Sequence, residues 1–463
     1  MGRQNYYICI DLKSFYASVE CVERGLDPFQ SNLVVADPER SKSTICLAIT
    51  PAMKRLGVKN RCRIHEIPDH IKYITAMPRM QLYLDYSARI YSIYLKYVSK
   101  EDIHVYSVDE CFIDVTEYLQ FHHMTPKELA FEMMRAVKEE TGITATAGVG
   151  TNLYLAKIAM DILAKHADDH IGVLDEISYR EQLWDHQPLR DFWRIGSRTE
   201  KKLAGYGIHT MGDIALASIS SEDLLYKIFG IDAELLIDHA WGYEPCTMEQ
   251  VKAYKPETNS VCSGQVLHCP YDFDKAKLVV KEMTDLMTLD LVDKRLVTDQ
   301  IVLTVGYDIE NLTDPDRYRK YKGSVTIDRY GRKVPKHAHG TTNLKRKTSS
   351  TMLITNAVME LYDRIVDKNL LIRRINITAN KLVDESFSKE EETYEQLDLF
   401  TDYTVKEQEQ AEEEAVLERE KRMQQTMLTI KKKFGKNAIL KGMNLQEGAT
   451  AKDRNEQIGG HKA

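Results

Sequence analysis

Apolar and polar positions along the first 180 residues follow two alternating patterns. Short apolar runs of strand length alternate with segments in which apolar residues recur every three to four positions, the spacing of one helix face. The strand-like runs occupy residues 6–11, 33–37, 44–49, 103–108, 111–115, 144–150 and 171–174. The helix-like segments occupy residues 15–25, 51–58, 69–100, 127–141 and 152–165. Strands and helices mixed in this order predict an α+β domain built on a sheet.

The pattern changes twice in the rest of the chain. Residues 180–250 read as helical throughout, and the polar, proline-containing stretch 251–260 lacks periodicity and reads as a linker. A second α+β unit follows, with strand-like and helix-like segments at residues 263–269, 273–291, 300–308, 351–367 and 372–382. Beyond residue 384 the chain turns acidic and polar, with helix-forming runs but no core pattern. We therefore expect a disordered or partner-binding tail.

Composition describes a soluble globular protein of two to four domains, with 463 residues, 43% hydrophobic and 29% charged. No stretch approaches the roughly 20 apolar residues needed to span a bilayer. The opening MGRQNYYICIDL lacks the organisation of a signal peptide. The eight cysteines are scattered without a C-x-x-C pair, which favours free thiols over a disulfide framework or a zinc site. We expect no membrane association and a cytoplasmic location.

The net charge of −7 is unevenly distributed. Residues 385–422 hold 14 acidic and five basic side chains, whereas residues 317–347 hold 11 Lys and Arg against one acid, Asp328. A segment this basic, with tyrosines between the cations, suits contact with nucleic-acid phosphates. The overall acidity therefore does not exclude a nucleic-acid partner.

The segment YSVDECFID (residues 106–114) places the acidic pair Asp109-Glu110 between two strand-like runs. A polar hairpin turn explains the pair by itself, since two-residue loops commonly join strands. Asp11, however, ends the first strand-like run. Three carboxylates at strand ends can hold two divalent cations about 3.5–4 Å apart, the arrangement used for phosphoryl transfer. Oxygen ligands of this kind suit Mg²⁺.

The segment IDLKSFYASVE (residues 10–20), followed by YSVDECFID, resembles the catalytic signature of the Y-family translesion DNA polymerases, the UmuC/DinB-like or impB/mucB/samB group. The resemblance extends from residue 6 to about residue 385. KFGKNAILKG and RNEQIGGHKA near the C-terminus are similar to tails of a Gram-positive UmuC-type branch. The resemblance implies error-prone addition of dNMPs to a primer 3′-OH opposite damaged template, without proofreading, in DNA repair and SOS damage tolerance.

The resemblance also implies a domain organisation, that of a right-hand polymerase of the α+β class. The expected parts are a palm (1–15 and 76–178), fingers (16–75), a helical thumb (179–250), a linker (251–258), an α+β little finger (259–385) and a tail (386–463). We expect the enzyme to be a monomer.

Catalytic roles follow from the same resemblance. Asp11, Asp109 and Glu110 would hold two Mg²⁺ ions, which Mn²⁺ could replace, and the backbone carbonyl of Leu12 would be a further ligand. Tyr16, next to Phe15, falls five residues after Asp11 and would be the steric gate that excludes ribonucleotides among the incoming dNTPs. Two aromatic side chains that simply pack in a core are the plain alternative.

Lysines for the triphosphate match the family less closely. Lys54 occupies the family's cationic position, although Pro51 stands where many members carry a tyrosine. Lys157 matches the first lysine of the LAKIAMD motif. Lys165 comes one residue later than the usual spacing, a rotation of about 100° on an α-helix. Each lysine could instead be a solvated surface charge.

Contacts with template-primer DNA are predicted at two places. Residues 191–215 resemble a helix-hairpin-helix, whose Ile-Gly-Ser turn suits a phosphate oxygen, although an ordinary αα-hairpin is the alternative. Its candidate residues are Gly196, Arg198, Gly205 and Gly207. The candidates in the little finger are Arg329, Arg332, Lys333, Lys345 and Arg346.

QLDLF (residues 396–400) matches the consensus of peptides that bind the bacterial sliding clamp, the β subunit. Gln396, Leu397, Leu399 and Phe400 would be its anchors, and a chance match of five residues is the alternative. Two other function classes remain open. A palm-fold nucleotide cyclase would use similar acids but would not need the DNA-binding features, and a catalytically silent DNA- and clamp-binding accessory would not need the acids.

Overall fold

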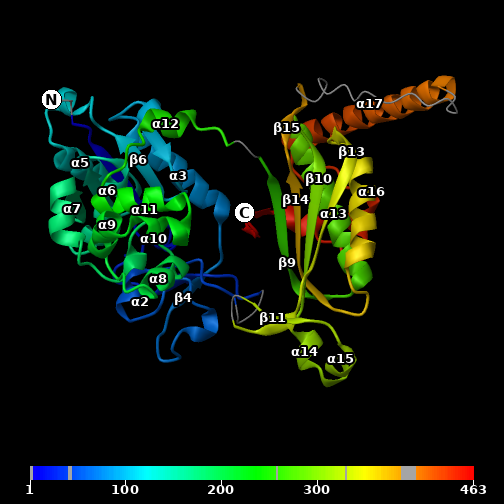
Figure 1. The fold of residues 1–463 in the computed structure, drawn as a ribbon, viewed down its shortest axis with the longest axis horizontal. Helices are drawn as coiled ribbons and strands as arrows, with labels where there is room; N and C mark the ends of the chain where they lie inside the picture. Colours follow the sequence, from blue (N-terminus) through cyan, green and yellow to red (C-terminus); the bar gives the residue numbers. More distant parts are fainter. Residues whose placement is uncertain (1–3, 40–43, 257–258, 329–330, 387–402) are drawn as a thin grey trace. The chain divides into compact units, whose positions relative to one another are not determined.

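The computed structural model describes residues 4–39, 44–256, 259–328, 331–386 and 403–463. It divides into two compact units, residues 1–255 with 461–463 and residues 256–460, and each unit is built on a sheet of its own (Figure 1). Residues 251–253 of the expected linker 251–258 belong to a helix, and the linker itself stays a prediction. The finer domain boundaries stay predictions.

The larger sheet of the first unit has the strand order β5-β6-β1-β7-β8. Its strands are β1 (Tyr7–Leu12), β5 (Ile103–Val105), β6 (Glu110–Asp114), β7 (Ala145–Gly150) and β8 (Ile171–Leu174). The central strand β1 pairs antiparallel with β6 and β7, while β7 and β8 run parallel. The end of β1 therefore lies between two neighbouring strands.

Helices cover both faces of this sheet. Because alternate side chains of a strand point to opposite faces, β1 sends Ile8 and Ile10 into one core and Tyr7 and Cys9 into another. The helices of the first core are α1 (Phe15–Val22), α3 (Met80–Tyr94) and α5 (Pro126–Thr141). The second core is closed by α6 (Leu153–Ile158) and the turn that follows it. The short helix α4 (Leu119–His122) precedes α5.

A smaller sheet is inserted between α1 and α3. Its strands β2 (Leu33–Val35), β3 (Ala48–Ile49) and β4 (Ile74–Ala76) have the order β3-β2-β4. Helix α2 (Pro51–Arg55) begins with a proline at its first position and is capped by Thr50, which accepts from the Met53 N–H. Met53 lies in a small core distinct from those of the larger sheet. This insertion is the predicted fingers region.

Residues 176–253 contain helices joined by loops and no strand, which agrees with the helical character predicted for residues 180–250. The helices are α7 (Glu176–Leu183), α8 (Ser197–Ala204), α9 (Met211–Ser220), α10 (Glu222–Phe229), α11 (Asp232–Trp241) and α12 (Met248–Ala253). The five helices from α7 through α11 share one apolar core with α6, which packs on the larger sheet. The thumb helices are therefore packed directly onto a palm helix.

The second unit has a five-stranded antiparallel sheet, four of whose strands have the order β13-β10-β14-β9, with helices on one face (Figure 1). The strands are β9 (Val261–Tyr271), β10 (Leu296–Tyr307), β13 (Ala338–Thr348) and β14 (Ile372–Asn380), and the short β15 (Val383–Asp384) pairs with the start of β10. The helices α13 (Phe273–Asp293) and α16 (Thr351–Ile365) enclose the core.

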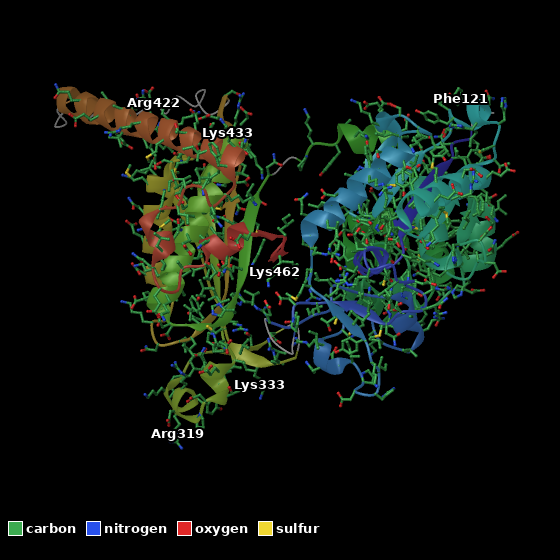
Figure 2. The ribbon with its side chains drawn as sticks, turned by 180° about the vertical axis from the view of Figure 1, so that it is seen from behind. Phe121, Arg319, Lys333, Arg422, Lys433 and Lys462 are labelled. Carbon is green, nitrogen blue, oxygen red and sulfur yellow. The ribbon has the colours of Figure 1, made fainter. Side chains whose placement is uncertain are left out.

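Residues 308–337, between β10 and β13, form an insertion in this unit. It contains α14 (Glu310–Thr313), α15 (Pro315–Lys320) and the hairpin of β11 (Val325–Ile327) and β12 (Lys333–Pro335). Figure 2 shows Arg319 and Lys333 on this insertion. Most of the basic segment detected in the sequence thus lies outside the main sheet.

The C-terminal segment corrects one expectation. Residues 403–460 are not a coreless tail, because α17 (Tyr403–Phe434) and α18 (Ala451–Asn455) pack against α13. Glu282 of α13 is buried and accepts hydrogen bonds from the Asn444 side chain and from the Thr450 and Ala451 N–H groups. Part of the contact is made by such polar groups, which a hydrophobic pattern does not reveal.

Candidate active site

The three acidic residues lie at adjoining ends of β1 and β6. Asp11 pairs with Glu110 across the strands. One residue further, the Leu12 N–H donates to the Asp109 carbonyl oxygen at 2.9 Å. The N–H groups of Tyr106 and Ser107 each donate to the Glu110 carbonyl oxygen at 3.0 Å, which closes the hairpin between β5 and β6. The hairpin interpretation and the proximity of the acids are therefore both correct, while the catalytic roles stay predictions.

Negative charge accumulates at this strand end. Burial, followed by the charges of Asp109 and Glu110, raises the pKa of Asp11 to about 7. Burial also raises the pKa of Glu110, although Lys157 opposes the shift. Carboxylates that resist ionisation together are the setting in which a divalent cation lowers the energy of the charged forms.

The acidic side chains are at present held by protein groups. Ser107 Oγ donates to Asp109 Oδ1 at 2.6 Å, and Lys157 Nζ lies 2.7 Å from Glu110 Oε1. Across the described ranges, no three His, Cys, Asp or Glu side chains are gathered as a metal-binding shell. The donor chemistry nevertheless fits a hard cation, since Asp11, Asp109 and the Leu12 carbonyl offer only oxygen. Glu110 would have to part from Lys157 to join them.

The two aromatic residues after Asp11 have different environments. Phe15 is 2% exposed and packs in the core beside the sheet, and its predicted nucleotide contact stays a prediction. Tyr16 is half-buried, and its ring stacks on Tyr83 with centroids 4.5 Å apart and an interplanar angle of 18°. Burial and the nearby charge of Asp109 raise the pKa of Tyr16. The predicted gate thus lies beside the carboxylates.

Two lysines lie close enough to Asp11 for its charge to shift their pKa values. Burial lowers the pKa of Lys54, and Lys165 lowers it further while Asp11 raises it. Lys13 shows the same influences, since burial and Lys54 lower its pKa and Asp11 raises it. Lys13 was not singled out in the sequence, although its place two residues after Asp11 was the available signal. Lys13 and Lys54 beside Asp11, with Lys165 near Lys54, could receive a polyphosphate.

A π-helical turn over Ala159–Leu163 ends the helix before Lys165. The Ala164 N–H donates to the Ala159 carbonyl oxygen at 2.9 Å, an i to i−5 bond in place of the usual i to i−4. Lys165 lies in the turn that follows, where the rotation of about 100° per residue of an α-helix does not apply. Its charge acts on Lys54, so this lysine lies near Lys54.

Lys157 forms ion pairs with two acidic residues. Its side chain is only 8% exposed, and Nζ lies 2.7 Å from Glu110 and 3.1 Å from Asp161. Burial disfavours the charged ammonium, but the surrounding acidic groups outweigh it and raise the pKa of Lys157. The structure thus places Lys157 as the counter-ion of Glu110, where the sequence predicted a triphosphate contact.

Glycines in β7 allow α6, the helix that carries Lys157, to lie close against the sheet. A Cβ at Gly148 would lie 2.1 Å from the Ala156 carbonyl oxygen, and a Cβ at Gly150 would lie 2.2 Å from the Ala156 nitrogen. No side chain fits at these distances, so α6 lies directly on the strand.

The thumb residues predicted to bind DNA surround α8. Gly196 is the N-cap of this helix, no side chain caps the helix there, and a Cβ on Gly196 would meet nothing within 4 Å. Gly207 has φ +77°, which explains why glycine occupies that position. Gly205 continues the right-handed helical conformation and Arg198 is exposed. The N-terminus of α8 suits a phosphate oxygen.

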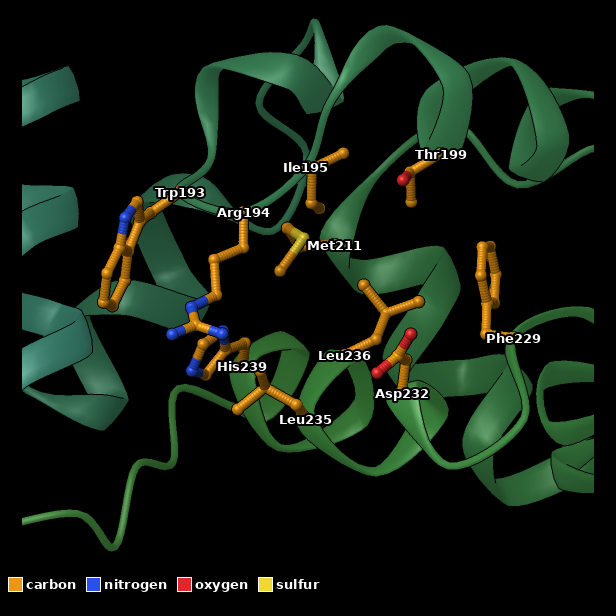
Figure 3. A pocket seen from close by; sticks show the side chains of 10 residues that line it. All are labelled: Trp193, Arg194, Ile195, Thr199, Met211, Phe229, Asp232, Leu235, Leu236 and His239. Atoms are coloured by element: carbon orange, nitrogen blue, oxygen red, sulfur yellow. The ribbon is translucent and has the colours of Figure 1, made fainter. Parts of the chain in front are cut away.

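The thumb also contains a cavity of about 370 Å³ (Figure 3). Its lining includes Trp193, Arg194, Phe229, Asp232 and His239. None of the candidate catalytic residues borders it. We assign it no role.

The DNA-binding candidates of the second unit are distributed over two surfaces. Lys345 and Arg346 are exposed on β13, and Lys345 shares the uncovered sheet face with Asn343, whose side chain accepts from Gln300 at 2.9 Å. Lys333 is exposed on the insertion. Arg332 is ion-paired with Asp328 at 2.7 Å, which reduces its capacity to bind phosphate. Arg329 and the QLDLF peptide lie outside the described residues.

The uncharged side chains of the open sheet face were missed by the sequence analysis. Gln300, Asn343 and Asn380 are joined by hydrogen bonds across three strands. A charge count cannot detect neutral amides, and only the strand register places them in one row.

The first unit combines paired strand-end acids, a small inserted sheet and a packed group of helices, and the same chain carries a second α+β unit, which together are the features of a right-hand nucleic-acid polymerase. The impB/mucB/samB family model matches residues 10–161, and the model of that family's C-terminal domain matches residues 259–399. DNA polymerase IV 2 of Bacillus subtilis (strain 168) is 28% identical over the whole of both chains. DNA polymerase IV 2 of Halalkalibacterium halodurans is 27% identical over 98% of each chain.

One solved structure supports the fold. A Y-family DNA polymerase chimera, Dbh-Dpo4(243-245)-Dbh, superposes with a TM-score of 0.60 at 22% identity, over 82% of this chain and 99% of that chain. The chain belongs to the impB/mucB/samB family, and it is a Y-family translesion DNA polymerase. The cyclase and accessory alternatives are thereby disfavoured. No helix in the described part of the chain combines the length and apolar character needed to cross a membrane.

Proposed function

We propose that this polymerase adds dNMPs to a primer 3′-OH at the strand end that carries Asp11, Asp109 and Glu110. The observation that carries the proposal is the cross-strand pairing of Asp11 with Glu110. It gathers acidic side chains with raised pKa values beside a group of lysines. Two Mg²⁺ ions, or Mn²⁺ in their place, would lower the pKa of the primer hydroxyl and neutralise triphosphate charge when bound. Asp11, Asp109 and the Leu12 carbonyl would hold them.

The remaining residues bind and orient the reactants. Lys13, Lys54 and Lys165 would take the triphosphate, because all three lie in the field of Asp11 or of one another. Tyr16 would lie under the incoming sugar and exclude a 2′-hydroxyl. Lys157 would keep Glu110 ionised until the carboxylate is needed.

Duplex DNA would be held at sites outside the palm. The N-terminus of α8, with Gly196 and Arg198, suits one phosphate. The open sheet face with Lys345 and Arg346, and Lys333 on the insertion, would follow the backbone of the template-primer duplex. We propose that QLDLF binds the sliding clamp through Gln396, Leu397, Leu399 and Phe400, and that the enzyme acts as a monomer.

Primer extension on undamaged and lesion-containing templates tests the proposal. Wild-type protein with Mg²⁺ should extend both templates, and Asp109→Asn should reduce the rate by at least roughly a hundredfold, since metal coordination contributes several kcal/mol. An Asp223→Asn variant, which changes an exposed acid at the start of α10, serves as the control. Equal extension by wild type and Asp109→Asn would remove the catalytic assignment.

A further inference from the structure

The orientation of the Tyr16 ring depends on Tyr83. The two rings stack at a centroid distance of 4.5 Å, and Tyr83 is fully buried on α3. Because the two rings are in stacking contact, the plane of the Tyr83 ring sets the plane available to Tyr16. Whatever fixes Tyr83 therefore acts on the position of Tyr16.

Tyr83 is in turn held by Glu20. The Tyr83 hydroxyl donates to Glu20 Oε1 at 2.8 Å, and the Glu20 side chain on α1 is fully buried. Arg79 donates to both oxygens of the same carboxylate, from Nε to Oε1 at 2.9 Å and from Nη2 to Oε2 at 2.8 Å. Arg24, just beyond the end of α1, also contacts Oε2. Paired hydrogen bonds of this kind fix a carboxylate in position as well as in charge.

The balance of forces keeps Glu20 ionised. Burial raises the pKa of Glu20, but the hydrogen bonds from Arg79, Arg24 and Tyr83 outweigh burial and lower the pKa overall. The hydrogen bond to Glu20 is also the leading cause of the raised pKa of Arg79. The charged carboxylate is thus a permanent acceptor for the Tyr83 hydroxyl.

The network is located where the fingers join the rest of the unit. Glu20 lies near the end of α1, before the chain enters the small sheet, and Arg79 lies directly before α3, where the chain returns. The bidentate pair therefore ties the two connections together. A structural role in this junction is the alternative explanation, and it predicts a change in stability without a change in sugar selection.

We propose that Glu20 is a positioning residue for sugar discrimination, acting through Tyr83 on Tyr16. The inference rests on the proposed gate role of Tyr16. Glu20 holds the Tyr83 hydroxyl, and Tyr16 stacks on the Tyr83 ring. The position of the Tyr83 ring therefore sets where the Tyr16 ring would meet the 2′ position of the incoming sugar. Loss of the hydroxyl or of the charge lets Tyr83 turn, and Tyr16 then follows.

The experiment measures kcat/KM for a dNTP and for the matching rNTP. Tyr83→Phe keeps the ring and removes only the donor, and Glu20→Gln keeps the shape and removes the charge. Each should lower the discrimination ratio by roughly tenfold, the consequence of losing one buried hydrogen bond of about 1.4 kcal/mol. Tyr16→Ala is measured in parallel as the direct test of the gate.

The same two helices supply a matched control. Tyr86, three residues after Tyr83, donates to Glu23, three residues after Glu20, at 2.7 Å. This pair is exposed and does not include Tyr16. Tyr86→Phe and Glu23→Gln should therefore leave the ratio unchanged, so a general weakening of the contact between α1 and α3 is distinguished from an effect on the gate.

The outcomes separate the two hypotheses. If Tyr16→Ala leaves the ratio unchanged, the gate assignment itself is wrong. If Tyr16→Ala relaxes the ratio but Tyr83→Phe does not, the positioning role is wrong and the gate stands. Glu20→Gln leaves Arg79 without its partner and could fail to fold, in which case Tyr83→Phe alone decides. The double variant Tyr16→Ala/Tyr83→Phe should be no less selective than Tyr16→Ala, because the two residues act in series.

Discussion

Lys157 Nζ lies 2.7 Å from Glu110 Oε1, and both side chains are at most 10% exposed. Removal of one partner of a buried ion pair leaves the other charge without compensation. Lys157→Met should therefore lower the free energy of unfolding by about 3 kcal/mol and raise the pKa of Glu110 further. Thermal melting and the pH dependence of single-nucleotide incorporation measure the two effects.

The control for this variant is an ion pair on the surface. Lys127 lies 2.7 Å from Asp169, with the lysine 51% exposed. Lys127→Met should change the melting temperature little, because exposed pairs contribute at most about 1 kcal/mol. If Lys157→Met behaves like Lys127→Met, the counter-ion role of Lys157 is wrong.

Asp11 should make metal-free protein less stable as the pH rises. Its pKa is raised from 3.8 to about 7 by burial and by its acidic neighbours. A raised pKa in the folded state gives a stabilisation that is complete below the unfolded value and is lost as pH rises through the folded value. With metal removed by a chelator, the melting temperature of the wild-type protein should fall more than that of Asp11→Asn as the pH rises from about 5 to about 8. Parallel curves for the two proteins would contradict the shift.

Lys165 should affect nucleotide binding despite its unusual spacing. Lys165→Ala and Lys54→Ala should each raise the KM for dNTPs by about tenfold, which corresponds to the loss of one charge-assisted contact to phosphate. Steady-state kinetics on a single template base measure this effect. Lys100→Ala, an exposed lysine with 75% of its side chain in solvent, is the comparison. An effect of Lys54→Ala without one of Lys165→Ala would remove Lys165 from the site.

The C-terminal segment should be a stable part of the second unit. Glu282→Ala would leave the Asn444, Thr450 and Ala451 donors without their acceptor, which should cost about 3 kcal/mol. Hydrogen exchange over residues 436–455 should increase strongly in this variant. Asp290→Ala, which removes an exposed pair with Lys294 on the same helix, should leave exchange unchanged. Rapid exchange of this segment already in wild-type protein would contradict the packing.

The features predictable from sequence were those set by local pattern. The hairpin at Asp109-Glu110, the helical thumb and the two α+β units follow from periodicity and turn residues, and the pairing with Asp11 follows from its place at a strand end. The partner of Lys157 was not predictable, because it depends on how closely α6 approaches β7. The packing of residues 403–460 was hidden for another reason, since polar side chains such as Gln424 make the contacts.

The π-helical turn over Ala159–Leu163 is the last turn of its helix, so the residue count beyond it no longer sets the direction of a side chain. Lys165 lies in the turn that follows, and one extra residue there does not carry it around a helix. A motif search with fixed spacing would therefore pass over Lys165, and it would do the same in any relative with such a turn. A search that allows one extra residue between Asp161 and the lysine would recover it.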